Sequence, residues 1–231
     1  MENVKPREKI TQGGTAAWPI CLGYLPIGLA FGVLAQKAGL SPFQVALMSI
    51  FVFAGSSQFI AVSMLSAGAS LTAIVATTFM VNLRHLLMSS SLAALLGKKD
   101  RWKLSLFAYG VTDESFAVNY TRLSAGNWGL DRSLVVNHIA NLVWLISTVA
   151  GVYFGHLIPA HAMGIDYALT AMFICLLIFQ LKDRTSILTA VMAGLLAVVL
   201  SLFIPGNAYI VLASMLAAAV GVIIKRGLAR D

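Results

Sequence analysis

About eight apolar runs divide the chain, each close to the length that an α-helix needs to cross a lipid bilayer. A bilayer core about 30 Å thick requires roughly 20 mostly apolar residues in a helix. The runs cover residues 16–36, 43–65, 70–96, 104–121, 134–158, 167–181, 187–204 and 208–224. They predict an all-α, polytopic transmembrane bundle of about seven to eight spans, with 1–231 as one membrane domain and 1–15 as a polar N-terminal segment.

The composition fits a chain that lies almost entirely in a membrane. Charged residues make up 11% of it and the mean hydropathy is +0.86, whereas soluble domains carry roughly 25% charge. The net charge of +7 is expected of a membrane protein, because lysine and arginine collect on cytoplasmic loops, so we predict no nucleic-acid partner. The sequence contains no HExxH, GxSxG or Walker A motif and no cysteine or histidine spacing typical of a metal site. We therefore predict no enzyme activity, no metal and no cofactor.

The positions of the basic residues disagree with eight full crossings. With a cytoplasmic N-terminus, strict alternation places residues 1–15, 66–69, 122–133, 182–185 and the C-terminus inside. The cluster at 98–103, three lysines and an arginine, would then lie outside, against the rule that basic loops face the cytoplasm. We therefore expect one of the first four runs to be broken or re-entrant. The candidates are the second run, with Ala54-Gly-Ser-Ser-Gln58, and the fourth run, with Asp113 and Glu114.

A short motif occurs in both the first and the fifth run. Gly28-Leu-Ala-Phe31-Gly32 resembles Gly151-Val-Tyr-Phe154-Gly155. Many transporters are built from duplicated helix bundles that hold the substrate between them. The motif indicates two related three-helix repeats, about 16–96 and 134–204. The alternative is chance similarity in a chain with 19 glycines.

The polar residues with the highest free-energy cost in a membrane lie in the middle of the third run. Asn82, Arg84 and His85 have roughly a dozen apolar or small residues on either side. Arg84 stays charged, so it requires a partner or a wet cavity. Its planar guanidinium suits a carboxylate, and Asn82 shares a helix face with His85. These residues predict a substrate-binding pocket, with a structural ion pair between Arg84 and an acid of the fourth run as the alternative.

Two adjacent acids, Asp113 and Glu114, interrupt the fourth run. On a helix their side chains point about 100° apart, so they cannot serve one spot equally. A carboxylate at membrane depth can carry a proton, neutralise Arg84 or bind a substrate ammonium. We predict proton coupling or ammonium binding at this pair. The alternative is that the run is short and both acids lie near an interface.

Two further groups of uncharged polar residues lie in the second and fifth runs. In the second run, Ser56, Ser57 and Gln58 are added to the predicted substrate site. Residues of this kind also mediate helix packing in lipid. The fifth run carries a polar stripe at helical spacing, made of Asn137, Asn141, Trp144 and Thr148. Such a stripe faces protein or water, and interhelical hydrogen bonding alone is the alternative to a functional role.

Five short motifs occur one after another along the chain. They are LGYLPIGLAFG at 22–32, FAGSSQF at 53–59, NLRHL at 82–86, Asp113-Glu114 and GIDYA at 164–168. Over nearly the whole chain this series resembles the AzlC-like family, the large subunits of two-component branched-chain amino acid exporters of bacteria. The resemblance implies an inner-membrane secondary transporter that exports valine, leucine or isoleucine, and sometimes methionine. It also implies a small AzlD-like membrane partner of about four spans.

The residues and the resemblance combine into one mechanistic hypothesis. Arg84 pairs with the carboxylate of an amino acid, while Asp113 or Glu114 meets its ammonium or carries a coupling proton. The remaining hydrogen bonds come from Ser56, Gln58 and Asn82. The alternatives are an exporter or channel for a different small solute, and a scaffold subunit whose polar residues only bind its partner. A homo-oligomer is compatible with each of them.

Overall fold

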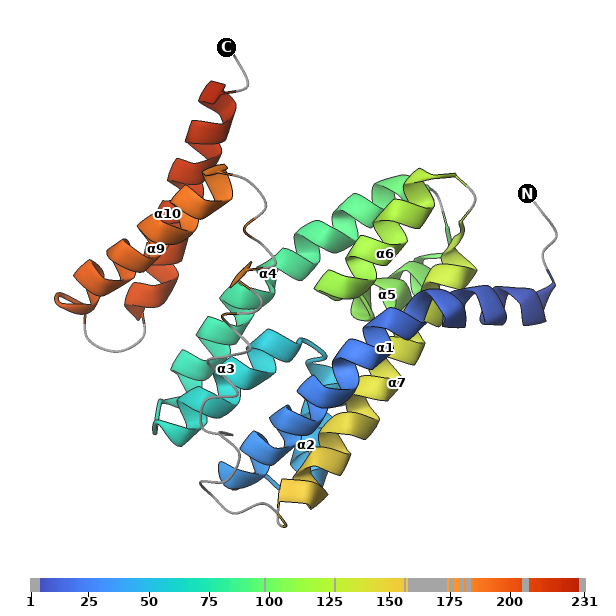
Figure 1. Cartoon of the computed structure of the whole chain (residues 1–231), viewed down its shortest axis with the longest axis horizontal. Coiled ribbons are helices and arrows are strands. Elements are labelled where there is room, and N and C mark those ends of the chain that lie inside the picture. The colour runs from blue at the N-terminus through green and yellow to red at the C-terminus, as the bar shows by residue number, and fades with distance from the viewer. Residues whose placement is uncertain are drawn as a thin grey trace. The chain divides into compact units, whose positions relative to one another are not determined.

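The structure is a computed structural model that describes residues 5–97, 99–126, 128–155, 184–204 and 208–228, together with Leu157, Ile174, Leu177, Ile178 and Leu181. In these ranges the chain is helical apart from short connections (Figure 1). The helices are α1 Pro6–Lys37, α2 Pro42–Phe51, α3 Gly55–Ser66, α4 Leu71–Leu96, α5 Arg101–Tyr109, α6 Asp113–Ser124, α7 Leu130–Gly155, α9 Arg184–Ser201 and α10 Ala208–Leu228. Four of them, α1, α4, α7 and α9, are long and apolar enough to cross a bilayer, which confirms the predicted all-α membrane protein.

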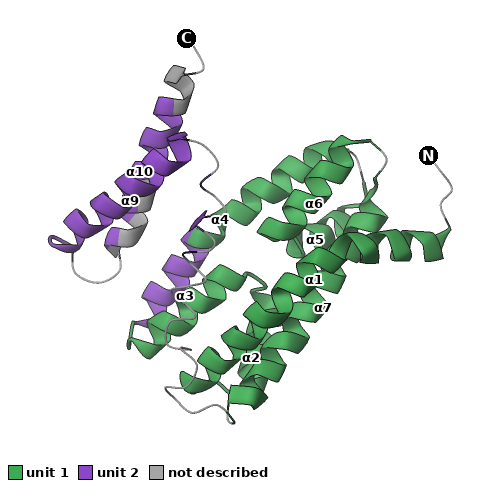
Figure 2. Cartoon of the chain, viewed as in Figure 1, with its two compact units in different colours: residues 1–69, 81–166 green, residues 70–80, 167–231 purple. Residues whose placement is uncertain are grey.

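The chain divides into two compact units, shown in separate colours in Figure 2. The first unit comprises residues 1–69 and 81–166, and the second comprises residues 70–80 and 167–231. In the second unit α9 packs against α10. The sixth apolar run and the motif at 164–168 lie almost wholly outside the described residues. All the predicted site residues belong to the first unit.

The second and the fourth apolar runs are each broken into two short helices. The breaks lie at residues 52–54, between α2 and α3, and at residues 110–112, between α5 and α6. Phe53 has a φ of 36°, a backbone conformation that no helix of L-residues can pass through. At about 1.5 Å per residue, none of these helices of 9 to 12 residues covers a bilayer core alone. Both candidate runs are therefore broken, and neither forms one continuous membrane-spanning helix.

Capping residues explain where two of the short helices begin. Ser41 forms a capping box with Gln44 at the start of α2, and Thr112 forms one with Ser115 at the start of α6. Each box satisfies backbone groups that the helix leaves open. The start of α3 at Ala54 has no such side-chain cap. The N-terminus of α3 is therefore the least satisfied of the three, and it lies beside Arg84.

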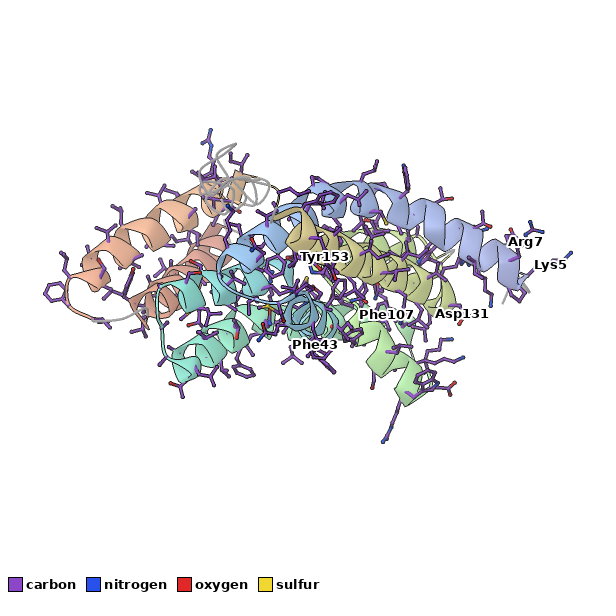
Figure 3. All side chains as sticks on the ribbon, turned by 90° about the horizontal axis from the view of Figure 1, so that it is seen from below. Lys5, Arg7, Phe43, Phe107, Asp131 and Tyr153 are labelled. Atoms are coloured by element: carbon purple, nitrogen blue, oxygen red, sulfur yellow. The ribbon has the colours of Figure 1, made fainter. Side chains whose placement is uncertain are left out.

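Basic residues from four parts of the first unit gather at one end, which we call the basic end. Its cavity of about 530 Å³ is lined by residues that include Lys9, Lys99, Lys103 and Arg132. Figure 3 shows Lys5 and Arg7 of α1 at the same end as Asp131 of α7. Within the polar N-terminal segment, residues 6–15 are helical and extend α1 to this end. The positive-inside rule predicts that the basic end faces the cytoplasm.

The residues that line the cavity at the basic end show on which side of the unit the broken segments begin and end. Lys103 of α5 and Leu123 of α6 both line its cavity, so the α5–α6 segment enters and leaves the unit on one side. Leu96, the last residue of α4, lies there too, so the α2–α3 segment before α4 must return to the side from which it came. This arrangement differs from strict alternation of eight crossings, which would put 98–103 outside and 66–69 inside. The re-entrant α2–α3 segment places 98–103 on the side of the N-terminus and removes the conflict, and the re-entrant α5–α6 segment keeps the connection to α7 on that side.

The two copies of the glycine motif meet where α1 packs against α7. A Cβ atom on Gly32 would lie 2.1 Å from the carbonyl oxygen of Thr148, and one on Gly151 would lie 2.3 Å from that of Leu29. Only glycine permits this backbone contact, as in other closely packed membrane helices. Close packing alone accounts for the glycines, and the two-repeat interpretation stays a prediction.

This packing leads to a matched pair of stability predictions. Gly32→Ala is expected to lower the free energy of unfolding by about 1–3 kcal/mol or more, because its methyl group overlaps backbone that cannot easily move. On the same helix, a Cβ at Gly23 would meet no atom within 4 Å, so Gly23→Ala is expected to be neutral or stabilising by up to about 1 kcal/mol. Thermal unfolding in detergent compares the two. Equal melting temperatures would contradict the close approach of α1 and α7.

Candidate functional site

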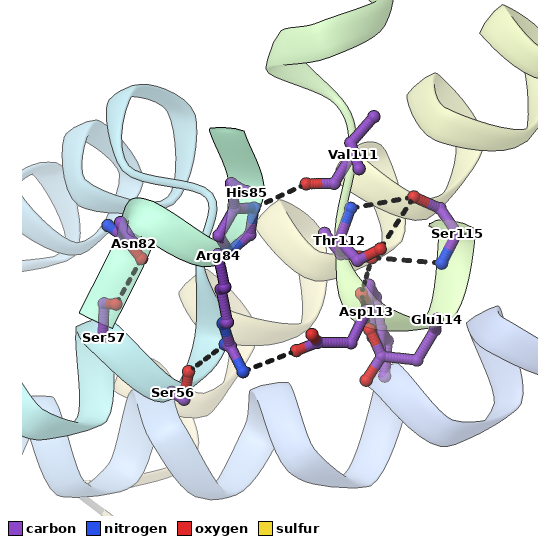
Figure 4. A network of polar contacts seen from close by, with 11 residues as sticks. Ser56, Ser57, Asn82, Arg84, His85, Val111, Thr112, Asp113, Glu114 and Ser115 are labelled. Carbon is purple, nitrogen blue, oxygen red and sulfur yellow. Dashed lines mark hydrogen bonds and ion pairs between the residues drawn. The ribbon is translucent and has the colours of Figure 1, made fainter. Parts of the chain in front are cut away.

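The side chain of Arg84 joins the two broken segments (Figure 4). Its Nη1 lies 2.9 Å from Oδ2 of Asp113, in the first turn of α6. Its Nη2 donates a hydrogen bond to the hydroxyl of Ser56, in the first turn of α3. One guanidinium from α4 thus connects the N-terminal ends of α3 and α6. The alternative given above, an ion pair between Arg84 and an acid of the fourth run, involves Asp113.

The Arg84–Asp113 pair is open to its surroundings. The Arg84 side chain is 33% exposed and that of Asp113 is 46% exposed. In a water-filled site, a pair of this exposure contributes only about 0–1 kcal/mol to stability, because water competes for both charges. The Nε of Arg84 is buried and has no hydrogen-bond partner among the described residues. The guanidinium therefore keeps donors for a further acceptor, which distinguishes it from a fully occupied structural pair.

Asn82 and His85 each fix one of the breaks. Oδ1 of Asn82 accepts a hydrogen bond from the hydroxyl of Ser57, next to the start of α3. Nδ1 of His85 lies 2.8 Å from the carbonyl oxygen of Val111, inside the α5–α6 break. Because a carbonyl only accepts, Nδ1 must carry the proton. The Nε2 atom of His85 is buried without a partner in the described part of the chain.

Glu114 points away from Arg84 and toward α1. The hydroxyl of Tyr24 lies 2.7 Å from Oε2 of Glu114 and 2.7 Å from Oγ1 of Thr112. Tyr24 is buried, so this carboxylate belongs to a more enclosed environment than that of Asp113. The two acids therefore have different partners, in agreement with the divergence expected of adjacent helical residues.

Gln58 lies in the packed interior of the first unit. It is fully buried, its Oε1 accepts from Nε1 of Trp144 at 2.9 Å, and its Nε2 donates to Oγ of Ser49 at 3.3 Å. The hydroxyl of Ser49 is also 2.9 Å from that of Thr148. Gln58 thus fastens α3 to α2 and α7, with both ends of its amide occupied.

The asparagines of the α7 stripe hold the α5–α6 segment in place. Asn137 is fully buried, accepts from Nδ2 of Asn119 at 2.9 Å and donates to the carbonyl of Phe107 at 3.0 Å. Asn141 donates to the hydroxyl of Tyr109 at 3.4 Å. These bonds are interhelical and within one chain. They position the break that carries the two acids.

Two tyrosines complete the arrangement and were not among the predicted site residues. Tyr24 contacts Glu114, and the hydroxyl of Tyr109 donates to the carbonyl of Ile50 near the end of α2, linking the two broken segments. Both tyrosines stand inside apolar runs. A phenolic hydroxyl at membrane depth requires a partner, and this was the signal available in the sequence.

These features define a polytopic helical membrane protein in which broken helices gather charged side chains inside a bundle, an arrangement used by secondary transporters. The chain belongs to the AzlC family. The family model, described as AzlC protein, matches residues 19–158, which span α1 to α7 and contain every predicted site residue. The resemblance drawn from the sequence motifs is thereby confirmed.

Several relatives resemble the chain over most of their length. It is 31% identical over 202 residues to "Inner membrane protein YgaZ" of Escherichia coli K12, covering 84% of this chain and 82% of the relative. It is 32% identical over 203 residues to "Branched-chain amino acid transport protein AzlC" of Bacillus subtilis 168, covering 86% and 78%. An uncharacterized membrane protein of Helicobacter pylori J99 is 32% identical over 210 residues, 90% of each chain. No solved structure matches. The named relatives and the long apolar helices confirm a membrane location.

Proposed function

We propose that this protein is a secondary-active transporter subunit that exports branched-chain amino acids from the bacterial cytoplasm. The observation that carries the proposal is the half-exposed Arg84–Asp113 pair where two broken helices meet. Charges at membrane depth mark substrate and ion pathways. The name of the Bacillus subtilis relative supports branched-chain amino acids as the substrate class.

The site has one part for each charge of a zwitterionic amino acid. Arg84 and the uncapped N-terminus of α3 form the positive part, where the helix dipole adds to the guanidinium charge. The substrate carboxylate would replace Asp113 on Arg84 and accept a hydrogen bond from Ser56. Ser57 and Asn82 hold this surface in shape, and the released Asp113 would meet the substrate ammonium.

In this proposal Glu114 carries the coupling proton. Glu114 shares a hydrogen-bonded group with Tyr24 and Thr112 and is separate from the Arg84 pair. A carboxylate in such a group can take up and release a proton as its surroundings change. The fully buried Gln58 and Asn137 position the broken segments and do not touch the substrate. His85 acts in the same way through Val111, and Asn141 through Tyr109.

We propose the partner from the family resemblance alone, because Asn137 and Asn141 of the α7 stripe make their hydrogen bonds within the chain. Expressed with an AzlD-like partner, the chain is expected to speed the loss of labelled leucine from loaded cells, and a small helical membrane protein is expected to co-purify in mild detergent. A pure homomer that exports leucine would overturn the two-component proposal.

The same efflux experiment separates the alternative functions. Efflux of an unrelated solute but not of leucine would favour an exporter or channel for a different solute. No efflux of any solute would favour a scaffold subunit.

A further inference from the structure

The basic end contains a second cavity, of about 390 Å³, which we call the arginine cavity. It is lined by Thr11, Gln12 and Thr15 of α1, Arg122 of α6, Arg132 of α7, and Trp128 from the connection between α6 and α7. All six residues belong to the first unit. The cavity lies far along α1 from Tyr24 and takes no part in the substrate site proposed above.

Two guanidinium groups stand over one indole ring in this cavity. The Cζ atom of Arg122 lies 5.3 Å from the ring centroid of Trp128, and that of Arg132 lies 5.0 Å from it. Nη1 of Arg132 also donates to Oε1 of Gln12 at 2.7 Å. Stacking on an aromatic face orients a guanidinium while leaving its edge free to donate hydrogen bonds.

Neither arginine has an acidic partner among the described residues, in contrast to the neighbouring lysines. Lys9 lies 2.6 Å from a carboxylate oxygen of Asp131, and Lys103 lies 4.0 Å from one of Asp100. The described ion pairs include no carboxylate bound to Arg122 or Arg132. The Nε1 of Trp128 is also buried without a partner in the described part of the chain. The cavity is therefore lined by two arginines that have no acidic partner among the described residues, and such a pair suits an anion.

The surface beside the cavity indicates what kind of anion. Trp18 and Leu22 follow Thr11 and Thr15 at helical spacing on α1, and they are 62% and 51% exposed. An apolar strip thus leads from the cavity toward the membrane interior. A ligand with a phosphate at one end and acyl chains at the other would fit both parts, whereas a free phosphate would use only the first.

We propose that the arginine cavity binds the phosphate headgroup of an anionic lipid of the cytoplasmic leaflet. The basic end faces the cytoplasm, where such lipids are concentrated, and basic pockets between membrane helices are suited to them. The lipid phosphate bridges Arg122 and Arg132, and its acyl chains lie along Trp18 and Leu22. Because the bridged residues come from α6 and α7, the lipid ties the α5–α6 segment to the rest of the unit.

The test measures binding of fluorescent phosphatidylglycerol to the purified full-length protein in detergent, against phosphatidylcholine with the same acyl chains. Each arginine near an anionic lipid contributes roughly a fivefold increase in affinity. Arg122→Gln is expected to weaken binding about fivefold, and Arg122→Gln with Arg132→Gln about twenty-five-fold. Arg101→Gln is the matched control, because Arg101 is exposed in the first turn of α5 and does not line the cavity. It is expected to leave binding unchanged.

A competition experiment tests whether the ligand is a lipid or a soluble phosphate compound. Glycerol 3-phosphate, which has the headgroup phosphate without acyl chains, is expected to compete at least tenfold more weakly than phosphatidylglycerol. Equal competition would replace the lipid with a soluble phosphate compound and overturn the proposal. Wild-type binding by the double variant, or equal binding of the two lipids, would overturn it as well. Arg122 is exposed, so its single variant remains informative if the double variant does not fold.

Discussion

Arg84→Gln is expected to weaken leucine binding by at least about 30-fold while the protein stays folded. Loss of one partner from a hydrogen-bonded charge pair in a binding site costs about 2–5 kcal/mol, and Arg84 is the cation in our proposed carboxylate site. Arg84→Lys is expected to restore only part of the affinity, because lysine keeps the charge but loses the planar two-point contact. Leucine binding to the purified protein, with Arg101→Gln as a control, measures these differences.

Thermal stability separates this account from a structural role of Arg84. In our proposed site, which is open to water, Asp113 is 46% exposed, so the loss of its partner is expected to cost no more than about 1 kcal/mol. A buried structural pair would cost about 3–5 kcal/mol when one partner is removed. A large loss of stability in Arg84→Gln that Asp113→Asn reverses, with leucine binding recovered, would show that Arg84 is a structural partner.

Glu114→Gln is expected to reduce uphill leucine export to background while exchange of labelled leucine at equal concentrations continues. Exchange need not release the coupling proton, whereas net export against a gradient must. Tyr24→Phe removes the hydroxyl that contacts Glu114 and is expected to slow uphill export in the same way. Export and exchange in reconstituted vesicles are measured with each variant.

Asp113→Asn serves as the comparison for the adjacent carboxylate. Because Asp113 contacts Arg84 and not Tyr24, this variant is expected to raise the half-saturating leucine concentration and to keep the pH dependence of export. Normal uphill rates and normal pH dependence in both Asp113→Asn and Glu114→Gln would contradict proton coupling at this pair.

The sequence was sufficient to name the two candidate runs, although it led us to expect a break in one of them and the structure has a break in both. The basic cluster at 98–103 conflicted with strict alternation, and of the two candidate runs only the second, near Ser56, precedes that cluster and can change its side. A break at either place changes the parity of the crossings. The structure contains both breaks: the break in the second run brings 98–103 to the N-terminal side, and the break in the fourth run keeps residues 123–132 on that side as well.

The partners of the polar residues could not be predicted from the sequence. Helical geometry showed that Asp113 and Glu114 diverge, but not which of them meets Arg84, since that depends on how α6 rotates against α4. Tyr24 lies far from Glu114 in sequence and carried no charge to draw attention to it. Gln58 looked like a pocket residue because amides at membrane depth are costly, and only the packing of Trp144 and Ser49 around it shows how it is satisfied.

The claim that Arg84 holds the substrate carboxylate is tested most directly by comparing leucine with leucinamide, which has the same side chain and ammonium but no carboxylate. The dissociation constants of both compounds are measured for the wild-type protein and for Arg84→Gln. We predict that the wild-type protein binds leucine at least about 30-fold more tightly than leucinamide, and that Arg84→Gln binds the two almost equally. An unchanged preference for leucine in Arg84→Gln would place the carboxylate elsewhere and contradict the account.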